Sequence, residues 1–121
     1  MFIDHIVVSV KNLKKSTKFY SAFLGKATES KWDISWKIGD TKLFITSPYK
    51  KFPLAFDKHN IGLNHIAFGV KTIAELKNFE QKLNKAKIKN SGTQIDKYST
   101  KEFIWFDDLD GIRLEFYLRI K

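Results

Sequence analysis

The sequence predicts an α+β fold in which two βαβββ modules follow one another along the chain. Three observations lead to this prediction. The second half of the chain repeats the first at an offset of sixty residues, each half opens with a strand rich in β-branched residues, and an amphipathic helix and three shorter strands follow in both halves. With 121 residues the chain has the length of a single domain and can bury a sizeable core.

The repeat is clearest in the first strand of each half. His5 aligns with His65, the preceding Asp4 aligns with Asn64, and the match continues into the following helix without a gap. A chance register would not readily give a histidine-led strand, a helix cap and a helix in the same order twice. We therefore divide this one domain into a first module at about residues 1–47, a linker at about 48–61 and a second module at about 62–121.

In the first module, the predicted helix lies between two residues that favour helix ends. Asn12 is a good N-cap and Gly25 a good C-cap. The helical spacing between them predicts a buried stripe made of Leu13, Thr17, Tyr20 and Leu24. The predicted strands of this module are Ile3–Val10, Lys26–Ser30, Trp32–Ile38 and Thr41–Ser47.

The second module follows the same order. Thr72 is the predicted N-cap, and the buried stripe of the helix is predicted to be Ile73, Leu76, Phe79, Leu83 and Ala86. The predicted strands are Leu63–Val70, Thr93–Lys97, Phe103–Asp107 and Ile112–Ile120. Because a four-stranded open sheet leaves an edge and one face uncovered, we expect the two modules to pair into one cupped mixed sheet.

Composition and charge narrow the function classes. Lysine and arginine number 22 and aspartate and glutamate 13, which gives a net charge of +9 and favours anionic ligands. All but two basic residues are lysines, whereas readers of bases favour arginine, so we expect no nucleic-acid partner. The absence of cysteine excludes a disulfide framework and a cysteine nucleophile. No basic signal-peptide region opens the chain and no apolar run reaches ~18 residues, so we expect a cytoplasmic protein without a membrane partner.

Alternation along the strands places three chemistry-bearing residues on open faces. His5 and His65 share their faces with mostly small residues, so those faces are expected to line a hollow. Glu115 lies opposite the packed face of the last strand, between Arg113 and Tyr117. Taken singly, Glu115 fits a solvated strand edge and each histidine fits a structural role. Together, two imidazoles and one carboxylate form the facial triad that binds Fe(II), Mn(II) or Zn(II).

Three segments carry a family resemblance that spans nearly the whole chain. They are residues 5–13 with Phe19-Tyr20 and Leu24-Gly25, residues 62–68, and residues 106–115. These motifs resemble the vicinal oxygen chelate superfamily, which includes glyoxalase I, fosfomycin-resistance proteins, methylmalonyl-CoA epimerase, extradiol dioxygenases and bleomycin-binding proteins. The resemblance implies a glyoxalase-like fold of paired βαβββ modules around a divalent metal, and a homodimer.

The resemblance also assigns site residues. It places His5, His65 and Glu115 at metal-ligand positions, for Mn, Fe, Zn or Ni, whereas Phe44 occupies the fourth position, where glyoxalase I and the epimerase have Glu or Gln. Tyr98 and Tyr117 are the candidates for the acid–base residue that extradiol dioxygenases need. The candidate substrate-binding residues are Trp36, Phe44, Ser99, Phe103, Trp105 and Arg113.

Three functions follow from these observations. The first is a metal-dependent enzyme (lyase, thiol transferase, isomerase or dioxygenase) acting on a small, oxygen-chelating, anionic substrate. The second is a metal-free protein that binds or sequesters a drug or metabolite. Binding of the cation bleomycin is disfavoured, because relatives that bind it generally lack the metal ligands, whereas this chain has three candidate ligands and is basic. The third is nucleic-acid binding through the basic segment at residues 82–89, which the solvated end of a helix explains more simply.

Overall fold

The computed structural model describes residues 1–119 and divides the chain into two compact units, Met1–Ala55 and Phe56–Lys121. Each unit contains one of the predicted modules. The end of the last predicted strand, at Ile120, lies outside the described residues. The intervening segment at residues 47–64 forms neither helix nor strand.

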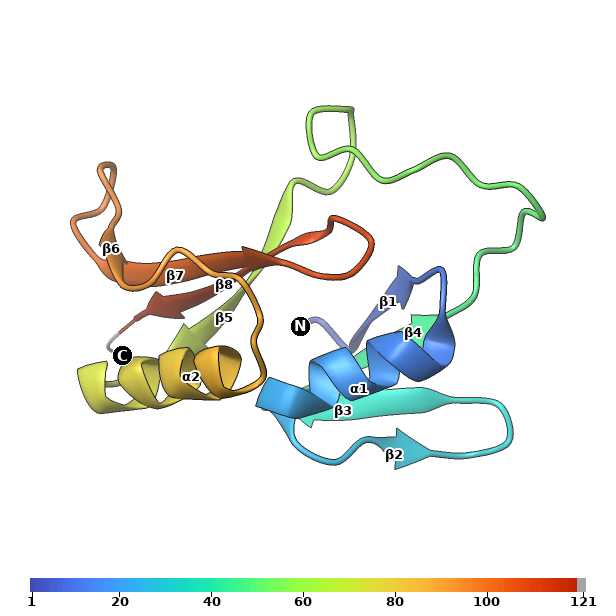
Figure 1. Ribbon diagram of the computed structural model, residues 1–121, viewed down its shortest axis with the longest axis horizontal. Coiled ribbons are helices and arrows are strands. Elements are labelled where there is room, and N and C mark those ends of the chain that lie inside the picture. The colour runs from blue at the N-terminus through green and yellow to red at the C-terminus, as the bar shows by residue number, and fades with distance from the viewer. Residues whose placement is uncertain (120–121) are drawn as a thin grey trace. The chain divides into compact units, whose positions relative to one another are not determined.

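The first module is a four-stranded sheet with one helix against it (Figure 1). Its elements are β1 (His5–Ser9), α1 (Leu13–Leu24), β2 (Thr28–Glu29), β3 (Ile34–Ile38) and β4 (Thr41–Thr46). The strand order is β1-β4-β3-β2, in which β1 and β4 are parallel and the other neighbours are antiparallel. The helix thus forms part of the crossover that returns the chain to the strand beside β1.

The second module repeats this topology element by element. It comprises β5 (His65–Val70), α2 (Ile73–Lys85), β6 (Gln94–Ile95), β7 (Glu102–Asp107) and β8 (Arg113–Leu118). The strand order is β5-β8-β7-β6, again with one parallel pair, β5 and β8. The predicted βαβββ order and the α+β class are therefore confirmed. Except for β7, which begins one residue earlier than predicted, the strands are shorter than predicted because they extend only as far as their hydrogen-bonded partners; β1, for example, pairs with β4 over five residues.

Side-chain caps fix where each helix begins. The Asn12 side chain accepts a hydrogen bond from the Lys15 amide at 2.9 Å, and the Thr72 hydroxyl accepts one from the Glu75 amide at 3.0 Å. Glu75 in turn accepts from the Lys71 amide at 2.9 Å, a reciprocal arrangement close to a capping box. Gly25, at φ 86°, ends the first helix in a backbone conformation that favours glycine.

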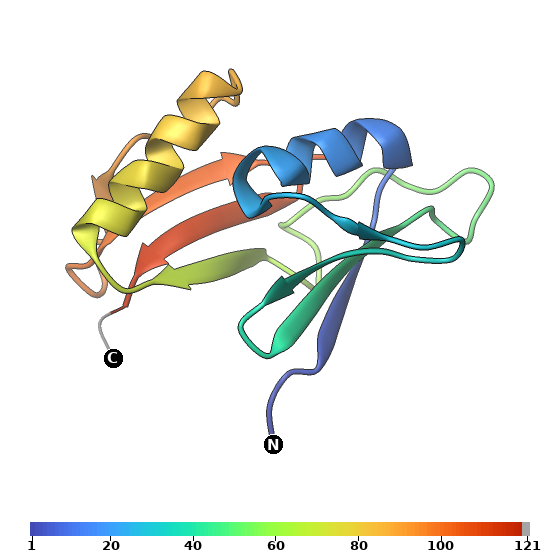
Figure 2. The same ribbon diagram turned by 90° about the horizontal axis from the view of Figure 1, so that it is seen from below.

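Each helix covers one face of its own sheet, as the turned view shows (Figure 2). The buried residues of α1 are Ser16, Tyr20 and Phe23, so the predicted stripe was correct only at Tyr20. In α2 the buried residues are Leu76 and Leu83, whereas Ile73 is 44% exposed. The predicted stripe was wrong at its two ends because Ile73 is the first residue of the helix and Ala86 lies beyond its last turn.

An aromatic cluster forms the centre of the second module's core. Phe116 of β8 is 1% exposed, and its ring stacks on Phe79 of α2 with centroids 4.2 Å apart. Phe106 and Phe68 lie against the same ring at 5.5 and 5.7 Å. Because Phe116 uses the helix-facing side of β8, its neighbours Glu115 and Tyr117 must lie on the opposite, open face.

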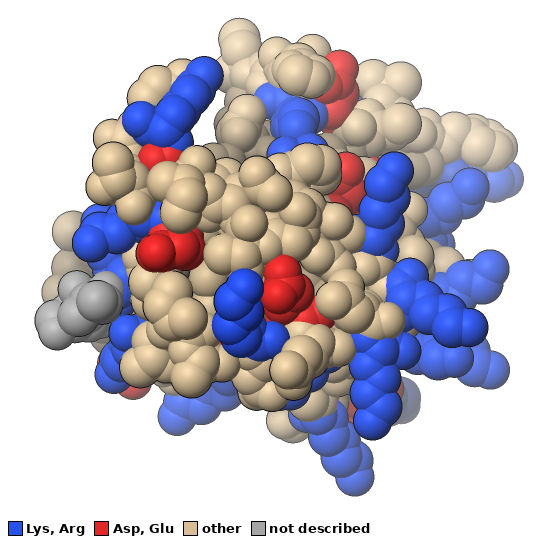
Figure 3. Space-filling model, turned by 60° about the vertical axis from the view of Figure 1, so that its left-hand side comes forward, with Lys and Arg blue, Asp and Glu red and all other residues tan. Residues whose placement is uncertain are grey.

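The surface carries many basic side chains. In Figure 3 lysine and arginine side chains project mainly from the edges of the visible face, and a few acidic side chains lie between them. Within the described residues, neither helix is long and apolar enough to cross a membrane.

Candidate functional site

The candidate site lies on the open face of the second module's sheet, where β5 and β8 run side by side. The strand register pairs Ala67 with Glu115 and Gly69 with Tyr117. Alternation places His65 on the same face, at the start of β5. The small side chains of β5 therefore lie beside the larger polar side chains of β8.

His65 and Glu115 approach each other across these two strands. The His65 Nε2 atom lies 3.6 Å from Glu115 Oε2, a separation longer than an ordinary hydrogen bond. The Glu115 side chain is 13% exposed and that of His65 is 40% exposed. The pair is thus open to a ligand at the histidine side, with its carboxylate mostly enclosed.

Asn64 fixes which nitrogen of His65 faces Glu115. Its side-chain Nδ2 donates to the Lys58 carbonyl at 3.2 Å, which orients the amide so that Oδ1 lies 2.8 Å from His65 Nδ1. An amide oxygen can only accept, so Nδ1 carries the proton in the neutral ring and the lone pair of Nε2 points toward Glu115. Backing of this kind orients histidine ligands in metal sites.

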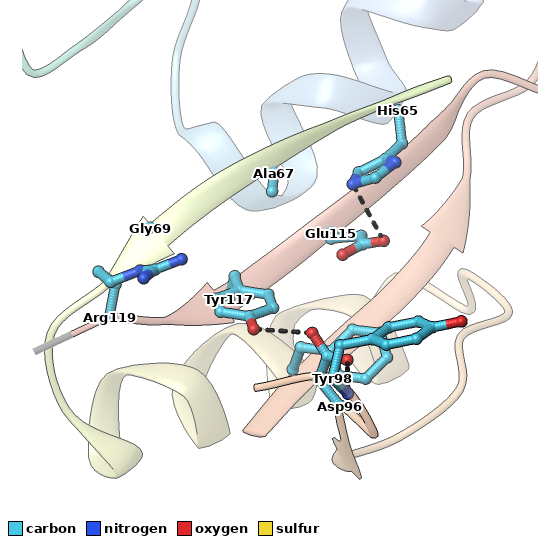
Figure 4. A pocket seen from close by; sticks show the side chains of 9 residues that line it. His65, Ala67, Gly69, Asp96, Tyr98, Glu115, Tyr117 and Arg119 are labelled. Atoms are coloured by element: carbon cyan, nitrogen blue, oxygen red, sulfur yellow. Dashed lines mark hydrogen bonds and ion pairs between the residues drawn. The ribbon is translucent and has the colours of Figure 1, made fainter. Parts of the chain in front are cut away.

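These two residues form one end of an open cavity of about 570 Å³ (Figure 4). Only residues of the second module line it: His65, Ala67, Gly69, Asp96, Tyr98, Phe103, Glu115, Tyr117 and Arg119. The cavity has mixed chemistry, because a carboxylate and an imidazole occupy one end, small and aromatic side chains the middle, and a guanidinium the other end.

A hydrogen-bonded cluster closes one wall of the cavity. The Tyr117 hydroxyl donates to Asp96 Oδ2 at 2.8 Å, the Ser99 hydroxyl donates to the same oxygen at 3.2 Å, and the two hydroxyls also contact each other. The backbone N–H of Tyr98, followed by the hydroxyls of Tyr117 and Ser99, holds the pKa of the Asp96 carboxyl below its ordinary value of 3.8. The Tyr117 proton is therefore directed at Asp96, and the cluster ties the loop at residues 96–101 to β8.

The sequence-based candidates in this module separate into two groups. Phe103, Tyr98 and Tyr117 line the cavity, and Ser99 supports its wall through Asp96. Trp105 and Arg113 do not line it: the Arg113 guanidinium lies 4.2 Å from the centre of the Trp105 ring, and its Nε donates to Asp107 at 2.7 Å. These contacts hold the two side chains on each other beside the cavity, and their assignment as substrate-binding residues stays a prediction.

In the first module, His5 occupies the position equivalent to His65. Its Nδ1 lies 2.7 Å from Asp4 Oδ2, so a carboxylate backs this ring as an amide backs the other. Phe44 pairs with Val7 as Glu115 pairs with Ala67, so an apolar ring stands where the second module has its carboxylate. The Phe44 and His5 rings meet edge to face with centroids 5.8 Å apart.

Trp36 was expected to wall a pocket, and the structure places it in the core instead. The side chain is 3% exposed, stands beside Tyr20 of α1 at 5.6 Å, and donates from its indole nitrogen to the Gly25 carbonyl at 3.0 Å. Its register partner is the buried Leu43, which puts Trp36 on the helix-covered face of the sheet. Packing against α1 therefore explains this residue.

Four residues of the cavity were not among the site residues proposed from the sequence: Ala67, Gly69, Asp96 and Arg119. A detectable signal existed for Asp96, because an aspartate three residues before a serine in a turn segment is typical of a side chain that caps its own loop. Arg119 continues the open face of β8 at two-residue spacing from Glu115 and Tyr117, so the same alternation would have found it.

The donor set of the His65–Glu115 pair fits a divalent transition metal. Imidazole nitrogen and carboxylate oxygen suit Zn, Fe, Mn and Ni, and two such ligands at ~2.1 Å from one tetrahedral ion lie ~3.4 Å apart, close to the 3.6 Å found here. Among residues 1–119, however, no group of three or more His, Asp or Glu side chains gathers in one place. The second module alone thus supplies two ligands.

Comparison with solved structures identifies the fold. A glyoxalase family protein from Enterococcus faecalis is 27% identical, with a TM-score of 0.73 over 96% of both chains. The genomically encoded fosfomycin resistance protein FosX from Listeria monocytogenes is 17% identical, with a TM-score of 0.72 over 98% of this chain and 93% of its own. Lactoylglutathione lyase from Agrobacterium tumefaciens is 14% identical, with a TM-score of 0.73 over 97% of this chain and 92% of its own. At 17% and 14% identity the latter two show a common fold.

Comparison by sequence assigns the family. No curated protein matches the chain. The family model of the Glyoxalase/Bleomycin resistance protein/Dioxygenase superfamily matches residues 2–116. The match extends from the first module into β8 and includes His65 and Glu115; of the residues that line the cavity, only Tyr117 and Arg119 lie beyond it. The chain therefore belongs to the Glyoxalase/Bleomycin resistance protein/Dioxygenase superfamily.

Proposed function

We propose that this protein is a divalent-metal-dependent enzyme that acts on a small, oxygen-chelating, anionic substrate. The observation that carries the proposal is the His65–Glu115 pair, because its imidazole lone pair faces a largely enclosed carboxylate across 3.6 Å inside a cavity. Two lone-pair-bearing atoms at this separation repel each other unless a metal ion or a proton lies between them. Members of the superfamily commonly use divalent metals, which supports the same reading.

In this proposal His65 Nε2 and Glu115 Oε2 are two of the metal ligands, and His5 is the third. The choice of His5 rests on the sequence repeat, which gives it the same strand position and the same backing acceptor as His65. When bound, the metal would supply Lewis acidity to oxygens of the substrate. Phe103 and Tyr117 would hold the apolar part of the substrate, and Asp96 would keep the Tyr117 hydroxyl turned toward the cavity wall.

The net charge of +9 supports an anionic substrate, because a positive field concentrates anions around the molecule. Among reactions on chelating oxygens, the proposal covers lyase, isomerase, thiol transferase and dioxygenase chemistry. A metal-free binding protein has no need of an imidazole held in one tautomer beside a carboxylate, so the pair favours the enzyme.

Metal analysis of protein purified without chelator tests the proposal. We expect close to one equivalent of Mn, Fe, Zn or Ni per chain in the wild type, and its loss in His65→Ala and in Glu115→Gln. His59→Ala is the matched control, because His59 is exposed in the segment before β5 and lines no part of the cavity. Absence of metal from the wild type after reconstitution, or equal loss in His59→Ala, would refute the proposal.

A further inference from the structure

The cavity of the second module continues well beyond the proposed metal ligands. Its floor runs along β5 from His65 through Ala67 to Gly69, and its far end is formed by Arg119 (Figure 4). On a strand rising ~3.3 Å per residue, the Cα atoms of Glu115 and Arg119 are ~13 Å apart. There is therefore room for more of a ligand than its chelating oxygens.

Gly69 keeps the middle of this floor open. Glycine inside a strand weakens it, so its presence needs a reason. The backbone gives none, because Gly69 does not have the positive φ of the chain's five other glycines. Packing gives none either, since a Cβ added at Gly69 would meet no atom within 4 Å. The effect of having glycine at this position is therefore to leave the cavity open, because any side chain here would occupy part of it.

Among the described residues that line the cavity, Arg119 is the one cation. Its backbone N–H donates to the Val70 carbonyl at 2.8 Å, which fixes the residue beside the end of β5. Its guanidinium lies 5.3 Å from the centre of the Tyr117 ring, and within the described part of the chain it forms no ion pair. Asp96, one of the two acidic lining residues, is already engaged by three donors.

We propose that Gly69 and Arg119 form a second subsite that binds a carboxylate at the far end of the substrate; this inference rests on the proposed function. The substrate is then a two-ended acid, with chelating oxygens at His65 and Glu115, a short apolar chain over Ala67 and Gly69, and a terminal carboxylate on Arg119. A single guanidinium suits a single carboxylate, which it binds with two parallel hydrogen bonds.

The charges of the lining residues couple this subsite to the metal. One arginine and two carboxylates give +1 − 2 = −1, and a divalent cation changes the sum to +1. A dianionic ligand should therefore bind only when the metal is present, and it should tighten metal binding by the same factor.

Calorimetric titration of the Mn²⁺-loaded protein with matched acids tests the subsite. The probes are 2-oxoglutarate and 2-oxoadipate, and their controls are the monoacids of equal chain length, 2-oxopentanoate and 2-oxohexanoate. We expect at least one diacid to bind about tenfold or more tightly than its monoacid, and Arg119→Gln to reduce that preference to below about twofold. Lys85→Gln removes the same charge at the exposed end of α2, outside the cavity, and should keep the preference.

A second variant tests the floor. Gly69→Leu should weaken both classes of acid about tenfold or more while leaving Mn²⁺ affinity unchanged and thermal stability undiminished, because nothing within 4 Å obstructs the new Cβ. If Mn²⁺ binds but no diacid is preferred, or if Arg119→Gln retains the preference, the subsite is refuted and the metal site stands. If none of Mn²⁺, Fe²⁺, Zn²⁺ and Ni²⁺ binds, both proposals fall.

Discussion

Replacing Asn64 by leucine tests how the proposed ligand His65 is oriented. In the wild-type protein the Asn64 amide is held from both sides, by the Lys58 carbonyl at 3.2 Å and by His65 Nδ1 at 2.8 Å. Leucine has nearly the same shape but accepts no hydrogen bond. The neutral ring of His65 then loses its preference for the Nδ1–H tautomer, and the Nε2 lone pair no longer faces Glu115 in most molecules.

The expected loss of metal affinity can be estimated from the exposure of the site. Removing the partner of a histidine ligand lowers metal affinity by ~10–100-fold, or ~1.4–2.7 kcal/mol. Because the His65 side chain is 40% exposed, water can replace the lost acceptor, and we expect a value near the lower end. Competition with a chromogenic chelator measures the affinity, and ¹⁵N chemical shifts of the His65 ring report the tautomer.

Asn64→Asp is the matched control. It keeps an acceptor next to Nδ1, as Asp4 does for His5 at 2.7 Å, so the affinity should stay within about threefold of the wild type. Unchanged affinity and an unchanged tautomer in Asn64→Leu would show that Asn64 does not orient the ring. Equal losses in both variants would point to the Lys58 contact instead, and so to the loop rather than the tautomer.

Three further predictions concern the scaffold. Phe116→Ala removes the ring at the centre of the aromatic cluster and should lower the free energy of unfolding by ~3–5 kcal/mol in urea titration, without abolishing the first module's fold. Thr72→Ala removes the N-cap of α2 and should cost ~0.5–2 kcal/mol in the same assay. The lowered pKa of Asp96 stabilises the fold above its ordinary value of 3.8 and this contribution is lost as pH falls through the lower value of the folded state, so the stability difference between wild type and Asp96→Asn should shrink on acidification. A difference that grows toward low pH would contradict the assigned hydrogen bonds.

The topology could be predicted because short local signals in the sequence mark each element, and because the same order of elements occurs in both halves of the chain. The caps Asn12 and Thr72 mark the helix starts, and turn residues such as Gly25 mark where the first helix ends. Two copies of the same order of elements reinforce each other. Strand lengths and helix stripes were less accurate, since they depend on where a partner strand stops and how a helix crosses its sheet, and neither is encoded at fixed spacing.

The site could be predicted only where alternation along one strand decides the answer. Glu115 and Tyr117 follow from the packed face of β8, and His65 from that of β5. Trp36 was wrong because its face depends on the register with β4, which a single strand does not reveal. Asp96 was missed because its role arises from a loop folding back onto β8, a contact between residues far apart in the sequence.

The two modules share a topology and a backed histidine, yet their open faces differ in chemistry. Register places Phe44 where the second module has Glu115, so the carboxylate that faces the His65 ring from the neighbouring strand is replaced by an apolar ring in the first module. The first module also has no arginine at the position equivalent to Arg119, since β4, the counterpart of β8, ends at Thr46 and Pro48 stands at that position. The proposed cation-binding pair and the proposed anion-binding end of the cavity therefore both belong to the second module. When one copy of a duplicated module carries the proposed binding groups, the open face of the other copy can accept different residues. In the first module that face carries the exposed Val7 and the ring of Phe44.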